Sequence, residues 1–231
     1  MDLELYERVL SAVEQAHGGT TTSQERSVAF YTLEGFKDRE DGVEYALYIL
    51  TTPSPRHTDQ VRHFALHCLE SVMARRWKPQ APPAANSASK GKGGSGAVGG
   101  AGGSSNGGGG GSGQEGGLSE AQQERLKTAM LEIMLQGTRD LRQEAQFIKI
   151  KVADLVAQVA ERLFPERWED LLDKILQAWT TGPTQAELAL LVLSKLIEDC
   201  MDGDFNSKLD SGRRDVILAA LNEFLPRLLP T

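Results

Sequence analysis

The sequence has 231 residues, a formal net charge of −7 at pH 7, 40% hydrophobic residues and 25% charged residues. This composition is typical of a globular protein with enough chain for one or two domains. It excludes a membrane-spanning protein, because no apolar run reaches about 18 residues. Neither half of the chain has the basic charge of a nucleic-acid-binding domain.

The N-terminus and the cysteines indicate an intracellular protein. The opening residues, MDLELYERVL, are acidic and lack the basic start and apolar core of a signal peptide. The two cysteines, Cys68 and Cys200, are far apart in the sequence, so they do not form a disulfide framework. Each lies on the apolar side of a predicted helix, where we expect it to be a buried core residue.

The first part of the chain carries four helical patterns. They are expected at residues 2–17, 22–39, 42–51 and 58–77. Gly18 and Gly19 end the first helix, while Thr22 or Ser23 caps the second. Apolar spacing predicts that the inward side of the second helix consists of Val28, Phe30, Tyr31, Leu33 and Phe36.

Residues 79–117 differ in kind from the rest of the chain. Sixteen of the 24 glycines fall here, together with proline, alanine and serine. Such a segment cannot bury enough apolar surface to offset the entropy of ordering it, so we expect a disordered linker or surface insertion. Composition alone leaves open whether it separates two domains or decorates one.

Five further helices are expected at residues 118–136, 146–164, 165–179, 184–200 and 211–229. The stretch 146–179 is the most pronounced, with Pro165 between two amphipathic helices. Proline is favoured in the first turn of a helix, so the second helix is predicted to begin there. Trp168 is then expected on its apolar side with Leu171 and Leu172, as a wedge between repeats.

These patterns predict an all-α fold of about nine helices, without strands. Antiparallel helix pairs joined by short links are typical of an α-solenoid of the HEAT type, and a compact helical bundle is the alternative. The expected domains are N-terminal HEAT-like repeats at 1–78, the Gly-rich insertion at 79–117, and repeats at 118–231 that continue the same solenoid.

No catalytic or cofactor-binding motif is present. The glycines at 107–111 follow no strand and precede no Lys-Ser/Thr, so they are not a phosphate-binding loop. His63, His67 and Glu70 share a helical side and form a weak metal-ligand pattern, with a solvated polar surface as the alternative. We therefore predict a binding protein without a cofactor or a structural metal, and not an enzyme.

Three segments resemble one protein family in the order in which that family carries them. They are VRHFALHCLESVMARRW at 61–77, LFPERWEDLL at 163–172 and TQAELALLVLSKLIEDC at 184–200. They resemble the nuclear export receptors of the importin-β superfamily, closest to the exportin-five/HASTY branch. Phe164 stands where that family usually has Trp, and Glu169 where it often has a second Pro. The similarity corresponds to the N-terminal end of much longer receptors.

The resemblance implies a HEAT-repeat arch that shuttles between nucleus and cytoplasm. Its N-terminal repeats would bind the small GTPase Ran in the GTP form along the inner, second-helix face. RNA cargo (microRNA precursors, tRNA) or protein cargo would be carried only by a full-length receptor. Nucleoporins are a further expected class of partner, and the chain is expected to be a monomer without membrane association.

The candidate Ran-binding or partner-binding residues are outward-facing polar side chains on the second helices. They are Gln60, His63, His67, Lys149 and Lys151. A basic set at 149–151 would suit an acidic patch on the GTPase, although both lysines could equally be solvated surface residues. Two other functions stay open: a helical-repeat scaffold with no nucleotide-state preference, and a metal-dependent enzyme built on His63, His67 and Glu70.

Overall fold

The structure is a computed structural model that describes residues 1–77, 117–136, 144–201 and 211–228. Within these ranges the chain is helical and contains no strand. The described helices are α1 (Leu3–His17), α2 (Ser23–Lys37), α3 (Gly42–Thr51), α4 (Asp59–Arg76), α5 (Glu120–Leu135), α6 (Gln146–Leu163), α7 (Leu171–Thr181), α8 (Pro183–Met201), α9 (Ser211–Phe224) and the 3₁₀ helix η1 (Leu225–Leu228). None of these helices is long and apolar enough to cross a membrane.

Local sequence signals determine where several helices begin. The Thr22 hydroxyl accepts the backbone N–H of Glu25 while the Glu25 carboxylate accepts the N–H of Thr22, forming a capping box at α2. Ser119 and Gln122 form the same reciprocal pair at α5, as their spacing predicts. Such contacts satisfy backbone donors that have no partner inside the helix. The helices with side-chain caps, α1, α2, α4 and α5, therefore begin within two residues of the expected positions.

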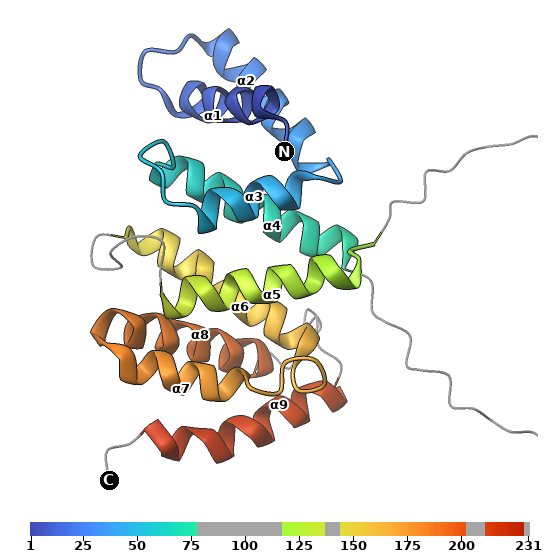
Figure 1. Ribbon diagram of the computed structural model, residues 1–231, viewed down its shortest axis with the longest axis vertical. Helices are drawn as coiled ribbons and strands as arrows, with labels where there is room; N and C mark the ends of the chain where they lie inside the picture. Colours follow the sequence, from blue (N-terminus) through green and yellow to red (C-terminus); the bar gives the residue numbers. More distant parts are fainter. Residues whose placement is uncertain (78–116, 137–143, 202–210, 229–231) are drawn as a thin grey trace, which may run out of the picture.

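The helices form antiparallel pairs that stack along one axis (Figure 1). α1 pairs with α2, α3 with α4, α5 with α6, and α7 with α8. Successive pairs are joined through two layers: α3, α5 and α7 pack against one another in the first, and α4, α6 and α8 in the second. The predicted all-α array of antiparallel helix pairs is confirmed.

The helix α6 is the centre of the packing. It contacts α4 on one side and α8 on the other, with α5 as its antiparallel partner. From Val152 to Leu163 most of its side chains are buried, including small residues such as Ala157 and Ala160 that allow close helix approach. Cys68 on α4 and Cys200 on α8 are also buried, as predicted.

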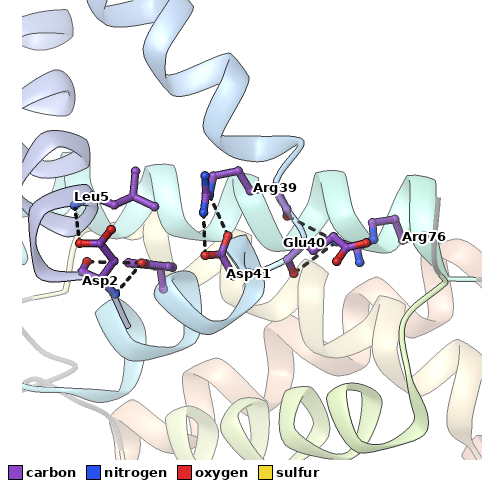
Figure 2. Close-up of polar contacts among 7 residues, drawn as sticks. Asp2, Leu5, Arg39, Glu40, Asp41 and Arg76 are labelled. Carbon is purple, nitrogen blue, oxygen red and sulfur yellow. Dashed lines mark hydrogen bonds and ion pairs between the residues drawn. The ribbon is translucent and has the colours of Figure 1, made fainter. Parts of the chain in front are cut away.

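The chain passes from α4 to α5 at a closed junction. The backbone N–H of Leu118 donates to the carbonyl oxygen of Arg76 at 2.9 Å. The guanidinium of Arg76 in turn donates to the carbonyl oxygens of Arg39 and Glu40, both at 3.4 Å, next to the Arg39–Asp41 ion pair (Figure 2). The predicted disordered insertion, apart from Gly117, lies outside the described residues.

The predicted position of Pro165 in the first turn of a helix is wrong. The Phe164–Pro165 peptide bond is cis, and α7 begins only at Leu171. The intervening residues form successive turns. In these turns the backbone N–H of Arg167 donates to the carbonyl oxygen of Leu163, and the N–H of Trp168 donates to the carbonyl oxygen of Pro165. Trp168 is buried as expected, but it lies in this turn and not on the helix.

The predicted inward side of α2 is partly wrong as well. Leu33 and Phe36 are buried, but Val28, Phe30 and Tyr31 are exposed. The helix lies at one end of the array, where it packs mainly against α1 and only slightly against α4 (Figure 1). A helix with one main neighbour buries only a narrow stripe, so apolar residues beside the stripe stay in solvent.

Candidate protein-interaction face

The outward side of the second-helix layer brings four of the five predicted site residues together. We call this surface the second-helix face, and its described members are Gln60, His63, His67 and Glu70 of α4, Phe147, Ile150, Lys151 and Asp154 of α6, and Glu187, Leu190, Ser194 and Glu198 of α8. Contacts between α4 and α6 and between α6 and α8 hold the three helices side by side. A face of this breadth on rigid helices is suited to binding a folded partner.

The two histidines of α4 lie one helical turn apart and contact each other. Their ring centroids are 4.5 Å apart in a T-shaped arrangement, and the His63 ring lies edge-on to Phe147 of α6 at 5.3 Å. Burial, followed by the charges of His67 and Lys151, lowers the pKa of His63 below its usual value. His63 is therefore a neutral, largely apolar part of the face near pH 7.

Lys151 links α6 to α4 by ion pairing. Its ammonium lies 2.6 Å from the Glu70 carboxylate and 3.8 Å from Asp154, while Glu70 also contacts His67 Nδ1 at 3.1 Å. Burial raises the pKa of Glu70, but the hydrogen bonds and charges of Lys151 and His67 outweigh burial and lower it. Lys151 is thus engaged within the protein.

The expectation that Lys149 points outward is wrong. The residue is buried, and its ammonium lies 2.8 Å from the Glu187 carboxylate on α8. A lysine stem packs readily along apolar surface while its charged end reaches a polar partner, here an acidic residue of the next repeat. The charges of the predicted basic set at 149–151 are therefore balanced by carboxylates of neighbouring helices.

The metal-ligand pattern of α4 does not form a metal centre. Within the described residues, no group of three His, Cys, Asp or Glu side chains is arranged to hold a metal ion. Glu70 is paired with Lys151, and His63 turns toward Phe147.

Sequence reasoning did not find three apolar members of the second-helix face. Phe147 and Ile150 on α6 and Leu190 on α8 are exposed. A signal for two of them exists, because Phe147 and Ile150 share their helical side with Lys151 rather than with the buried row. Leu190 offers no such signal, since α8 is apolar over most of its circumference.

The geometry is that of a helical-repeat protein, and comparison with known proteins shows which family it resembles. Residues 145–230 match the Exportin 1-like protein family. The chain is an exportin-5/HASTY-like sequence with an Exportin 1-like region, as its three quoted segments predict. Exportins are transport receptors and not enzymes, which agrees with the prediction of a non-enzymatic binding protein.

Three relatives show the extent of the similarity. The chain is 25% identical to Exportin-5 of Dictyostelium discoideum over 220 residues, 93% of this chain and 16% of the relative. It is 36% identical to Protein HASTY 1 of Arabidopsis thaliana over 83 residues, 36% of this chain and 7% of the relative. With Exportin-5 of Homo sapiens the identity is 25% over 156 residues, 68% of this chain and 10% of the relative. The chain thus spans less than a fifth of the length of these relatives.

Proposed function

We propose that the chain forms part of a nuclear export receptor and binds Ran in its GTP form through the second-helix face. The observation that supports this most is the Exportin 1-like match at residues 145–230, which covers α6 to α9. Two of these helices, α6 and α8, supply most of the face. The proposed binding region and the region of family similarity therefore overlap.

The contacts of the face are consistent with a protein partner. Gln60 is exposed, His63, His67 and Lys151 are partly exposed, and the His63 ring contacts Phe147. Polar groups surrounding exposed aromatic and aliphatic side chains are typical of protein interfaces. The proposed role of Lys149 is indirect, since the residue is buried and its ion pair with Glu187 fixes α6 against α8.

Transport of cargo would require more than this chain. We propose that RNA or protein cargo, and contacts with nucleoporins, involve a full-length receptor that shuttles between nucleus and cytoplasm. The chain covers only 16% of the Dictyostelium relative. Its described surface also carries many carboxylates, which repel nucleic acid rather than attract it.

A pull-down tests the proposal directly. Immobilised Ran loaded with a non-hydrolysable GTP analogue should retain the purified chain, whereas Ran loaded with GDP should not. The double variant Q60A/H67A removes two polar contacts of the face without touching the core, and should reduce retention. Recovery on neither form contradicts the proposal, and equal recovery on both forms favours a helical-repeat scaffold without nucleotide-state preference.

A further inference from the structure

Three exposed apolar side chains on the second-helix face lie on the two helices, α6 and α8, that the Lys149–Glu187 ion pair joins. Phe147 and Ile150 are three residues apart on α6, so they share a helical side. Leu190 lies three residues after Glu187 on α8, and Glu187 contacts Lys149 of α6. The Glu187 contact therefore places Leu190 on the side of α8 that borders α6.

In the lysine–carboxylate ion pairs of the second-helix face, the acidic partner is the more exposed one. In the pair between α6 and α8, the Lys149 side chain is 10% exposed and that of Glu187 41%. In the pair between α4 and α6, the values are 18% for Lys151 and 34% for Glu70. Within α8 they are 33% for Lys195 and 55% for Glu198. An approaching partner therefore meets the carboxylates of these pairs more than their ammonium groups, although each pair has no net charge.

We infer that Phe147, Ile150 and Leu190, bordered by Glu70, Glu187 and Glu198, form the docking surface for a basic amphipathic helix of a protein partner. Leucine-like side chains on one side of such a helix would cover the apolar residues, which is the usual mode for a helix in an apolar groove. Lysine or arginine residues beside them would meet the exposed carboxylates. This polarity is the opposite of the basic site expected from Lys149 and Lys151.

The charge of the surface argues for a protein helix and against a nucleic acid as the occupant. A polyanion would have to approach Glu187 and Glu198, whose carboxylates are the more exposed members of their pairs. The lysines that could attract it already have acidic partners at 2.8 Å within the fold. A basic helix gains attraction from the same groups and also buries the three apolar side chains.

A peptide experiment on the full chain tests this inference. The probe is a fluorescently labelled helical peptide of leucine and lysine with all leucines on one side, and its counterpart carries glutamate in place of lysine. Anisotropy should show binding of the lysine peptide only, with affinity falling as salt is raised. The variants F147S, I150S and L190S should each weaken binding about fivefold to tenfold, and E198Q about twofold to fivefold.

A matched control surface exists on α2. Val28 and Tyr31 are exposed apolar residues on a helix that also carries Glu25 and Glu34. V28S/Y31S therefore removes exposed apolar side chains near carboxylates, but outside the second-helix face. This double variant should bind the lysine peptide like the unchanged chain. An equal loss in V28S/Y31S, no loss in F147S and I150S, or binding of the glutamate peptide overturns the inference. So does a single-stranded RNA oligonucleotide that competes with the lysine peptide.

The inference deepens the proposed function, since both concern the second-helix face, but the two can fail separately. If the lysine peptide binds with the expected variant pattern and Ran is not retained in either nucleotide form, only the proposed function fails. If GTP-loaded Ran retains the chain and F147S leaves both this retention and peptide binding unchanged, only the inference fails.

Discussion

Arg62 and Glu144 form a buried ion pair that joins α4 to the segment just before α6. The Arg62 guanidinium lies 2.9 Å from the Glu144 carboxylate, and both side chains are almost completely buried. Arg62 also donates to the carbonyl oxygen of Leu50 on α3 at 3.5 Å. The pair thus connects two successive repeats inside the fold.

The first prediction concerns this pair. E144Q removes the negative charge that lies 2.9 Å from the buried Arg62 guanidinium, so we expect a loss of about 3–5 kcal/mol in the free energy of unfolding. R62M, which leaves the Glu144 charge unpaired, should cost a similar amount. Urea unfolding followed by circular dichroism measures both variants.

The double variant R62M/E144M is the control for this prediction. It removes both charges and replaces them with apolar groups of similar length, so it should be clearly more stable than either single variant. Additive losses in the double variant would show that the two residues contribute independently and not as a pair.

The second prediction follows from the closed junction between α4 and α5. Because the Leu118 N–H and the Arg76 carbonyl oxygen are 2.9 Å apart, a short connection can join Trp77 to Gly117. Replacing residues 78–116 by Gly-Ser-Gly-Ser should preserve the helical content. A connection roughly tenfold shorter should stabilise the fold by about 2 kcal/mol through a smaller loop-closure entropy.

Thermal unfolding and circular dichroism of the shortened chain check the second prediction. A cooperative transition at equal or higher temperature supports a single array that continues across the junction. Loss of cooperativity, or two separate transitions, would show that the repeats on either side of the replaced segment do not fold as one unit.

The third prediction is that both cysteines are unreactive in the folded protein. Burial raises the pKa of the Cys68 thiol to about 12, and burial with the nearby Glu161 and Asp199 raises that of Cys200 to about 11. Only the thiolate attacks a disulfide reagent, so at pH 8 the native chain should react with Ellman's reagent hundreds of times more slowly than in urea. C68S and C200S assign the residual reaction, and a fast native reaction at either residue contradicts its burial.

The fourth prediction concerns His63. Burial, His67 and Lys151 lower the pKa of His63 in the folded chain. At a pH between the folded and unfolded pKa values, His63 therefore binds a proton more readily in the unfolded chain than in the folded chain. The stability contribution of neutral His63 is therefore present above about pH 6.5 and is lost as the pH falls below it. K151Q removes one positive neighbour and should raise the pKa of His63.

Nuclear magnetic resonance titration of the histidine ring protons measures this change. K174Q alters a lysine on α7, outside the second-helix face, and should leave the His63 titration unchanged. A His63 pKa above 6.5 in the unchanged chain would contradict the arrangement of His63 next to His67 and Phe147.

Periodicity, caps and helix-ending residues are local features, so the sequence alone determined the helices, apart from the start of α7. The repeat of apolar residues every three or four positions defines an amphipathic helix, and Thr22 and Ser119 mark helix starts with their own side chains. The quoted segments around Trp77, Trp168 and Asp199 were also sufficient to predict the exportin resemblance. Neither inference needs knowledge of which helix lies beside which.

Only the tertiary structure decided which residues beside the predicted apolar stripes face solvent. Tyr31 is exposed because α2 ends the array, whereas Lys149 is buried because Glu187 of the next repeat lies within ion-pairing distance. The apolar spacing around Trp168 is compatible with a buried tryptophan in a turn or on a helix. Spacing alone therefore could not distinguish these two positions. The chemistry of the second-helix face depends on such contacts between repeats. Whether the Lys149 ammonium faces solvent or forms an ion pair inside the fold depends on Glu187, which lies some 40 positions away in the sequence.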